Sequence, residues 1–549
     1  MNPAVASRCI LPVAGVLAWA QVLRAEPAGG PGAGAAAKPA EARFDDRLAH
    51  DSGKIAVDAP VEGELRFQVH GEYQLRYATL SELPLRPHPQ EPEATTLGQE
   101  SRLYHWLRIT PRLTWSDSLA LVAQADLPYG LIAADPTLRV EPDRDPLDET
   151  DPLRLELRAL YLEWRSPIGL FRGGRQTSHW GMGLLANDGD HPTPFGDAYR
   201  GSITDRALFA TRPLGESSPF NVAIAGDWVA RDGSADRSKD ETAYQGVLAL
   251  FYEDDDKNRV GVYGVYRTQD RPSSSLGVDF DETLRVWVVD SAGRASTRVS
   301  GVEGWLYGEY EVAYVFGDTN FTRTVSQTYG NEREDVSQVG AAARVGLALT
   351  KGQGETEWGW LVPQLEWGWA SGDANPNDGV TKRFRFDPNY NVGLVLFDEV
   401  LRWKTARAAS IVRDPDLVQR PPPGTDLLPT NGSVSGATYL YPTFVMRPVP
   451  ELDLKAGVLV AQATSDVVDP IRLGTTGQFA NWDGGDATRR DLGLELDLGV
   501  EYRWAVGEYA VVQAGGQAGV LFPGNAFADA TGTTIGTQYI GVGRLGVQY

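Results

Sequence analysis

Residues 535–549 read IGTQYIGVGRLGVQY, and this stretch decides the fold. Ile535, Tyr539, Leu545 and Tyr549 stand at odd positions, whereas the charged Arg544 stands at an even one. An extended strand directs alternate side chains to opposite faces, so the pattern predicts one apolar face. The stretch is much longer than an ordinary strand of about 5–6 residues. It is long enough to cross a bilayer at a tilt, which takes about 9–11 residues.

The same period of two recurs along the chain. Residues 64–77 alternate Leu65, Phe67, Val69 and Tyr77 with charged or amide side chains, and residues 336–350 and 491–504 repeat the pattern. A helix would scatter both classes of side chain around its axis. We therefore expect strands throughout residues 61–549.

Eighteen segments carry this pattern, although those near 170, 203 and 283 are weak and 16 strands would also fit. The predicted strands are 63–77, 103–115, 119–129, 153–165, 170–177, 203–212, 220–230, 243–253, 259–268, 283–290, 304–316, 336–350, 357–370, 436–447, 453–464, 490–504, 508–521 and 535–549. Short connections alternate with long ones, as in outer-membrane barrels with short periplasmic turns and long extracellular loops. The prediction is an all-β, transmembrane, antiparallel up-and-down barrel of 16–18 strands.

The N-terminus has the features of an export signal. Arg8 precedes the apolar stretch 9–17, and small residues at 18–25 provide cleavage sites, so residues 1–25 are predicted to be a signal peptide. Residues 26–60 are rich in Ala, Pro and Gly and are expected to form a disordered periplasmic lead-in. No later stretch is apolar enough for a membrane-crossing helix of about 20 residues. Closure into a barrel is then the only way to satisfy every backbone group in lipid.

Charge and cysteine content exclude several classes of function. The formal net charge is −22, which argues against a nucleic-acid partner. Cys9 is the only cysteine and falls in the predicted signal, which is consistent with passage through an oxidising compartment. The acidic stretch 370–379, ASGDANPNDG, departs from a calcium-binding helix-loop-helix pattern. We predict no metal site and no cofactor.

Two segments resemble known families. Residues 173–190, GGRQTSHWGMGLLANDGD, and residues 386–400, FDPNYNVGLVLFDEV, resemble an uncharacterised family of predicted outer-membrane proteins from myxobacteria. The Gly-Arg-Gln at 174–176 is similar to alginate-export-type barrels and related specific porins. The final strand ending on Tyr549 resembles the signal recognised by the outer-membrane assembly machinery. These resemblances imply a monomeric barrel in a Gram-negative outer membrane, in contact with lipid and lipopolysaccharide, that moves a solute.

Side chains alone do not fill the lumen of so wide a barrel, and rings of charge would set its selectivity. Both signs occur on the polar faces, which suggests a transverse field, although the scarcity of lysine (8 residues) makes the arginines look like a coding preference. Residues 177–202 are the candidate constriction loop, in which Trp180 either contacts solute or packs against the wall. The candidate pore residues are Arg172, Arg175, Gln176, His179, Trp180, Asp188, Asp190, Glu309, Glu311 and Arg344.

The predicted function is a channel for small polar solutes, with sugars and anionic saccharides as candidates. The alternative is adhesion or recognition through the long extracellular loops, above all 371–436, or a structural role. That loop is unusually apolar, so it is expected either to contain a strand pair or to pack against the barrel. Enzymatic motifs are absent, and a hydrolase built on His179 with Asp188 or Asp190 is the weakest of the hypotheses.

Overall fold

The computed structural model describes residues 65–549 with gaps. The gaps are 88, 90–91, 94, 99–100, 116–117, 135–152, 198–200, 255–257, 276–277, 322–332, 353–356, 376–377, 414–427, 470–471, 474–475 and 508–509. The predicted signal at 1–25, including Cys9, and the lead-in at 26–60 lie outside the described residues.

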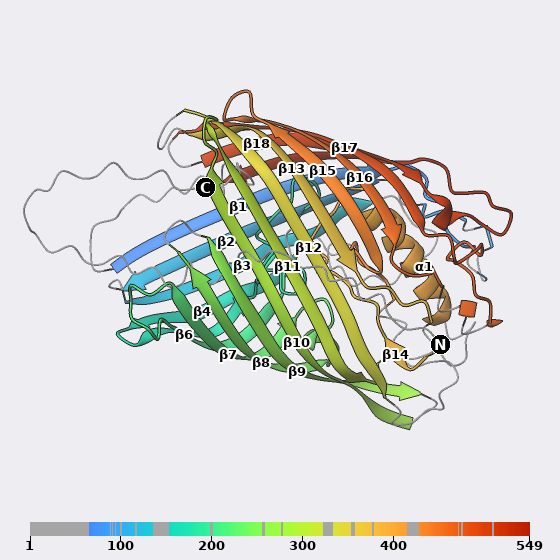
Figure 1. The fold of residues 1–549 in the computed structure, drawn as a ribbon, viewed down its shortest axis with the longest axis horizontal. Helices are drawn as coiled ribbons and strands as arrows, with labels where there is room; N and C mark the ends of the chain where they lie inside the picture. Colours follow the sequence, from blue (N-terminus) through green and yellow to red (C-terminus); the bar gives the residue numbers. More distant parts are fainter. Residues whose placement is uncertain are drawn as a thin grey trace, which may run out of the picture.

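Eighteen long strands form one closed wall (Figure 1), so the predicted fold class and the higher of the two strand numbers are confirmed. The strands of the wall are β1 (Leu65–Leu80), β2 (Ser101–Trp115), β3 (Leu119–Ala134), β4 (Arg154–Ser166), β5 (Gly169–Thr177), β6 (Ile203–Thr211), β7 (Phe220–Arg231), β8 (Thr242–Glu253), β9 (Arg259–Ser275), β10 (Val278–Arg298), β11 (Gly304–Thr319), β12 (Glu334–Lys351), β13 (Trp358–Ala370), β15 (Ala437–Met446), β16 (Leu452–Ala463), β17 (Asp491–Val506), β18 (Ala510–Pro523) and β19 (Gln538–Gln548). Each corresponds to one predicted segment.

The barrel closes where β1 pairs with β19. The two strands are antiparallel, with Glu72 opposite Gln548 and Leu80 opposite Ile540. Gly71 and Tyr549 exchange both backbone hydrogen bonds at 2.9 Å. An ideal Cβ on Gly71 would stand 2.2 Å from Tyr549 Cζ, so the tyrosine ring lies in the space that the glycine leaves. Closure leaves the wall without a free edge on which another chain could pair.

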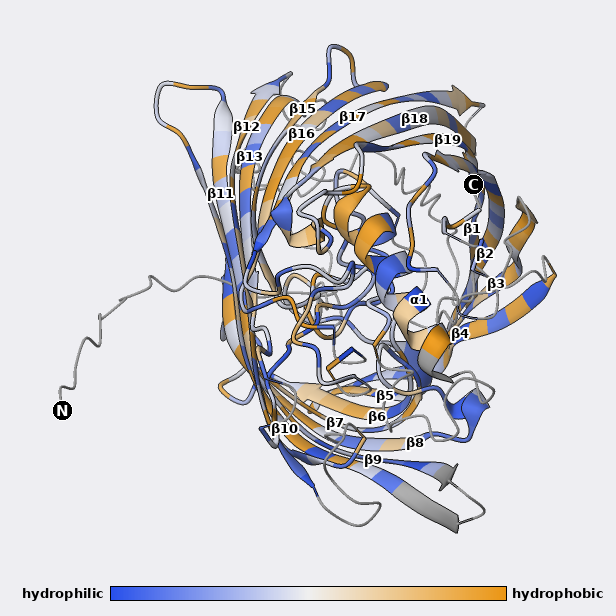
Figure 2. Cartoon of the chain, turned by 90° about the vertical axis from the view of Figure 1, so that its right-hand side faces the viewer, coloured by the Kyte–Doolittle hydropathy of each residue, from blue (hydrophilic) through white to orange (hydrophobic). Residues whose placement is uncertain are grey.

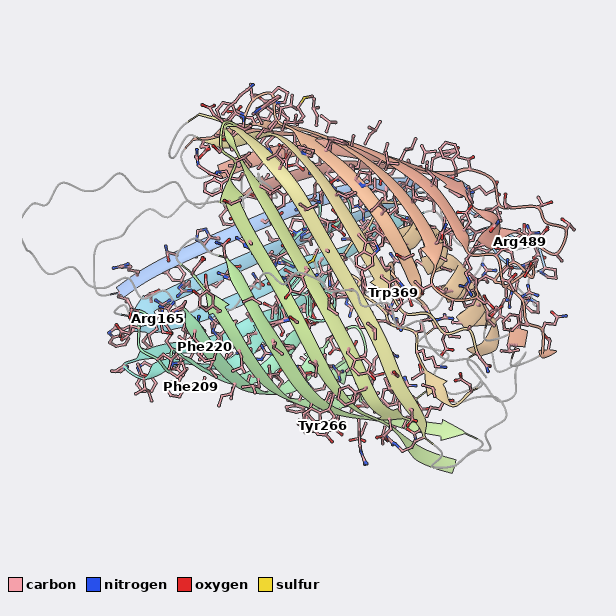
Figure 3. All side chains as sticks on the ribbon, viewed as in Figure 1. Arg165, Phe209, Phe220, Tyr266, Trp369 and Arg489 are labelled. Atoms are coloured by element: carbon pink, nitrogen blue, oxygen red, sulfur yellow. The ribbon has the colours of Figure 1, made fainter. Side chains whose placement is uncertain are left out.

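The wall has an apolar outer face. Leu65, Phe67 and Leu162 are among its exposed large side chains, and Figure 3 shows Phe209 and Tyr266 on the outer surface. Aromatic residues add to this face near the strand ends, including Trp115 and Trp164. A continuous apolar surface of this extent is disfavoured in water and suits the acyl chains of a bilayer.

The helical elements are short. Those of three residues or more in the described part of the chain are η4 (Arg237–Lys239), η6 (Leu396–Leu401), which is a π-helical turn, α1 (Arg402–Arg413) and η8 (Asn525–Phe527). Within the described part of the chain, no helix is both long and apolar enough to cross a membrane.

Two segments between strands fold into the barrel rather than away from it. The first inward segment is residues 178–197, after β5, and the second is residues 384–413, which contains η6 and α1. Figure 2 shows α1 inside the ring of strands. Leu184, Phe195, Phe397 and Val400 are buried in one cluster with side chains of the wall. The two segments therefore fill much of the lumen.

The long loop 371–436 packs against the barrel, as one of the two expectations held. Of the other expectation, a strand pair, the described residues of the loop show only an isolated antiparallel bridge between Arg385 and Ser435, while the short strand β14 (Val380–Thr381) pairs in parallel with Asp335 and Val336 of β12. Most of the remaining described residues are helical or irregular. Their apolar side chains are buried by the lumen, so no second strand is needed to cover them.

Candidate functional site

Glu311 of β11 fixes the first inward segment. Its carboxylate accepts hydrogen bonds from the backbone N–H groups of Met182, Gly183 and Leu184, at 2.5, 2.9 and 3.2 Å. Successive N–H groups that point at one anion form a nest, an arrangement that favours negative charge. Glu311 is thus an anchor for the loop and is itself buried, rather than a group exposed to passing solute.

Trp180 packs against the wall. Its indole stacks on Tyr263 with ring centroids 4.7 Å apart, and its Nε1 donates to Asp290 Oδ1 at 3.1 Å. The side chain is buried. Of the two interpretations given for Trp180, the structure shows the packed one.

Asp190 bridges the loop to two wall arginines. Its Oδ1 accepts from Arg108 at 2.5 Å and from Arg158 at 3.3 Å. Arg108 also forms a bidentate pair with Asp126, at 2.8 and 2.9 Å. The loop carboxylate is therefore part of a paired charge network on β2, β3 and β4.

His179 and Asp188, 9 positions apart in the sequence, meet within the first inward segment. His179 Nδ1 lies 3.4 Å from Asp188 Oδ1, and His191 Nδ1 lies 2.9 Å from the same oxygen. His191 was not among the predicted residues, because a histidine in a polar loop carries no periodic signal that would distinguish it.

Glu495 of β17 fixes the second inward segment in the manner of Glu311. It accepts from the backbone N–H groups of Leu394, Val395 and Leu396, at 2.5, 2.8 and 2.7 Å. The two segments also touch each other, since Asp387 N donates to Leu184 O at 2.7 Å. The alternative function, adhesion or recognition, was assigned to the long loops and above all to 371–436, and much of the described part of that loop is buried in the lumen.

Arg344 is the centre of an ion-pair cluster on the inner wall. It lies 2.5 Å from Glu309 and 2.7 Å from Glu366. The hydroxyls of Tyr390, from the second inward segment, and Tyr439, from β15, both donate to Glu366, at 2.8 and 2.6 Å. Charges of opposite sign are thus paired within the cluster rather than sorted to opposite sides of the lumen.

Arg172 also faces inward. It pairs with Glu163 of β4 at 2.6 Å and lies over the ring of Tyr161. It stands near the end of β5 that carries the short turn to β4.

Arg175 does not line the lumen, and its assignment to the pore is wrong. It lies opposite Leu160 of β4, which is exposed on the outer face, and pairs with Asp205 at 2.8 Å. The two-residue period that points Arg172 inward must point Arg175 outward. Gln176 is on the inner face but buried, and its amide lies 3.4 Å from the backbone oxygens of Gly174 and Arg206.

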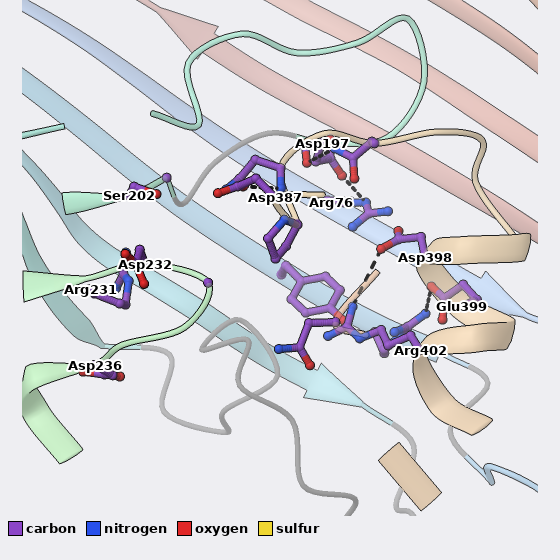
Figure 4. Close-up of a pocket in the computed structure, with 18 residues that line it drawn as sticks. Arg76, Asp197, Ser202, Arg231, Asp232, Asp236, Asp387, Asp398, Glu399 and Arg402 are labelled. Carbon is purple, nitrogen blue, oxygen red and sulfur yellow. Dashed lines mark hydrogen bonds and ion pairs between the residues drawn. The ribbon is translucent and has the colours of Figure 1, made fainter. Parts of the chain in front are cut away.

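A polar pocket lies where both inward segments meet the wall (Figure 4). Its lining combines four arginines with six carboxylic acids: Arg76, Arg102, Arg231, Arg402, Asp197, Asp232, Asp236, Asp387, Asp398 and Glu399. Arg76 lies 2.7 Å from Asp197, and Arg102 pairs with Glu399. The pocket volume is about 80 Å³, well below the roughly 300–1,000 Å³ of typical ligand sites. This volume has room for several waters but for no sugar-sized solute while both segments stay in place.

Burial changes the acidity of two pocket carboxyls. Removal from water raises the pKa of Asp387 to about 7, against the hydrogen bonds that its carboxylate accepts from Asn389. Burial, together with the charge of the adjacent Glu399, raises the pKa of Asp398. Both groups belong to the second inward segment, so its charge depends on pH near neutrality.

Several residues of this site have no distinguishing feature in the sequence. Asp197 bridges Arg76 and Arg544, each at 2.7 Å, and Glu495 differs in no local way from Glu501 on the same strand face. Their roles depend on which inward segment reaches them, and that contact joins parts of the chain far apart in sequence.

The closed wall, the apolar outer face and the polar, partly filled lumen define a large membrane-spanning β-barrel with inward-folded loops. No protein-family model and no curated protein sequence matches the chain. Among solved structures it is similar to Pseudomonas aeruginosa OccK5 (OpdH), at 11% identity and a TM-score of 0.44, covering 88% of this chain and 97% of that chain. Acinetobacter baumannii OccAB1 is similar at 9% identity and a TM-score of 0.46, covering 88% and 96%. Pseudomonas aeruginosa OccK2 (OpdF), solved in complex with glucuronate, is similar at 8% identity and a TM-score of 0.43, covering 88% of this chain and 95% of that chain.

Proposed function

We propose that this protein is a monomeric outer-membrane channel for small polar solutes, with sugars and anionic saccharides as the first candidates. The observation that carries the proposal is the polar pocket between the wall and the two inward segments. Guanidinium and carboxylate groups there offer donors and acceptors in one place, which suits a solute rich in hydroxyl or carboxylate groups.

Passage requires movement of an inward segment. The pocket is too small for a sugar, and the segments are held by hydrogen bonds and ion pairs as well as by apolar contacts. A segment bound by such interactions has a docked and an undocked state, and a solute that prefers the undocked state shifts the population toward it. In this proposal the second inward segment is the gate.

Conductance of the purified chain in a planar bilayer tests the proposal. We expect discrete steps in current, and swelling of liposomes that contain the protein when they are placed in isotonic sugar or sugar-acid solutions. A barrel that inserts but gives neither steps nor swelling, with a known porin as the positive control, would contradict channel function.

The orientation and the processing of the chain are parts of the same proposal. Residues 1–25 are removed on export, residues 26–60 stay in the periplasm, and the barrel is inserted by the assembly machinery that recognises the strand ending on Tyr549. The long loops then face lipopolysaccharide. Labelling of cysteines introduced at Thr531 and at Val449 on intact cells checks this orientation, because only the first should react. The resemblance to the myxobacterial family and to alginate-export-type barrels stays a prediction.

A further inference from the structure

His179, Asp188 and His191 form a compact cluster in the first inward segment. One nitrogen from each histidine and one carboxylate oxygen lie within 4.8 Å of one another. The two imidazole rings are stacked with centroids 4.1 Å apart, and both Nδ1 atoms approach the same oxygen, Asp188 Oδ1. Two histidines with one carboxylate, leaving other positions open, form a common donor set for transition metals.

The loop holds two of the three donors in place. His179 is buried, and its Nε2 lies 3.3 Å from the carbonyl oxygen of Gly181. A backbone carbonyl that accepts a hydrogen bond from one ring nitrogen fixes the orientation of a ligating histidine and directs the other nitrogen to the metal. In His179 that other nitrogen is the Nδ1 that faces Asp188.

Asp188 is fixed through its backbone. Its carbonyl oxygen accepts from Arg158, and a Cβ on Gly201 would stand 1.9 Å from that same oxygen. The chain at 201 therefore passes directly over Asp188, at a left-handed glycine with φ of 67°. His191 is about half exposed, so the third donor can adjust and the cluster is open to solvent on that side.

The charge around the cluster suits a cation. The nearby charges are three carboxylates, Asp126, Asp188 and Asp190, and two guanidinium groups, Arg108 and Arg158. One negative charge is therefore in excess as long as both histidines are neutral. Both arginines are directed to Asp126 and to Asp190 or the Asp188 carbonyl, not to the Asp188 carboxylate. The carboxylate oxygen between the two imidazoles, Asp188 Oδ1, also accepts the N–H of Asp190 at 3.0 Å, and it keeps the negative charge that a cation requires.

We propose that His179, Asp188 and His191 bind one divalent transition-metal ion of the Zn²⁺ class, taken up from the side on which His191 is exposed. Three protein ligands leave at least one coordination position for water or for an oxygen of a passing solute. The metal would join the exposed His191 to the buried His179 and so stabilise the first inward segment in the lumen.

The test uses the whole exported chain in detergent, freed of any histidine tag, and Zn²⁺ in competition with a chromophoric chelator. We expect one Zn²⁺ per chain. His191→Ala should weaken Zn²⁺ binding by at least about tenfold, since even the loss of a group that only hydrogen-bonds to a metal ligand costs about 10–100-fold in affinity. Asp188→Asn should do the same. Co²⁺ in place of Zn²⁺ should give a visible absorption band that both variants lose.

The matched control is His70→Ala, which removes a histidine on β1, opposite Thr110, and should leave Zn²⁺ affinity unchanged. Heat-modifiable migration on gels shows whether each variant is folded. The proposal is overturned if the folded wild-type chain binds no Zn²⁺ at 100-fold molar excess. It is also overturned if folded His191→Ala and Asp188→Asn bind Zn²⁺ as tightly as the wild type, which would place the ion elsewhere.

Discussion

The ring of Phe384 occupies the space in which a side chain at Gly340 would stand. An ideal Cβ on Gly340 of β12 would be 2.1 Å from Phe384 Cε1. Phe384 begins the second inward segment and is buried, with its N–H donating to Ser371 O at 2.9 Å. Because Gly340 has no side chain, the second inward segment can pack against the wall at this position.

Gly340→Ala should weaken the packing of the second inward segment against the wall while the barrel stays closed. Forcing a methyl group into a packed site costs about 1–3 kcal/mol, which would shift the docking equilibrium by about five- to 150-fold. We expect a higher open probability in single-channel recordings. Gly246→Ala on β8 is the matched control, because a Cβ there meets open space. Equal open probabilities in the two variants would show that Phe384 does not control the gate.

Glu495→Gln should release the backbone of the second inward segment. An amide keeps one acceptor oxygen but turns an N–H toward the donors at Leu394–Leu396. Hydrogen bonds to charged groups contribute about 1.5–3 kcal/mol, so amide exchange at these residues should quicken by about 10–100-fold. Hydrogen-exchange mass spectrometry measures this. Glu501→Gln, whose carboxylate lies 2.6 Å from Arg503 on the same strand, should leave the exchange unchanged.

Docking of the second segment should weaken as pH rises toward 7. The pKa of Asp387 is raised to about 7 when it is buried, against an ordinary value of about 3.9 in water. The docked state thus binds this proton more tightly than the undocked state. Its free-energy advantage is fully present below about pH 4 and is lost as pH rises to 7. We expect open probability to rise by up to about tenfold per pH unit between pH 5 and 7.

Asp387→Asn tests the assignment of that pH dependence. The amide cannot ionise, so its variant should show a flatter profile over the same range. A profile as steep as that of the wild type would assign the dependence to another group, of which Asp398 is the first to examine because its pKa is raised as well.

Arg344→Met should destabilise the whole barrel. It leaves Glu309 and Glu366 without the cation between them, and breaking a buried pair from one side costs about 3–5 kcal/mol. The loss should appear as a lower temperature for the mobility shift on gels. Adding Glu309→Gln and Glu366→Gln should restore much of the lost stability, since no buried carboxylate then lacks a counter-charge. Arg66→Gln, at an exposed position of β1, is the control and should have little effect.

The strands could be predicted because the bilayer imposes a long, regular period on the outer face. β10 shows the limit: residues 283–290 were predicted and the strand runs from Val278 to Arg298. Its later outward positions include Ser291 and Gly293, which are small and give no apolar signal. Tyr310 of β11 lies opposite Gly293, and its hydroxyl is 3.1 Å from Ser291 Oγ, so a neighbouring ring covers the gap.

The contents of the lumen could be predicted only in part. The apolar residues near 384–397 indicated burial, but the helix α1, which carries Arg402, Lys404 and Arg407, was not predicted. Lys404 is buried against Asp483 at 2.6 Å, a partner 79 positions away. Ile540 and Val542 of β19 likewise depend on distant parts of the chain. They interrupt the polar face of this strand because they belong to the buried cluster that includes both inward segments.

Glu311 and Glu495 accept hydrogen bonds from main-chain N–H groups, which every amino acid except proline supplies. Neither anchor therefore reads the side chains of Met182, Leu184 or Leu394–Leu396, apart from excluding proline, which lacks the N–H, whereas Gly183 is required by its left-handed φ of 89°. Neighbouring loop residues could be exchanged by mutation, or by design, to suit a different cargo while the attachment points stay as they are. A barrel built in this way can acquire a new selectivity by changing its contents rather than its wall.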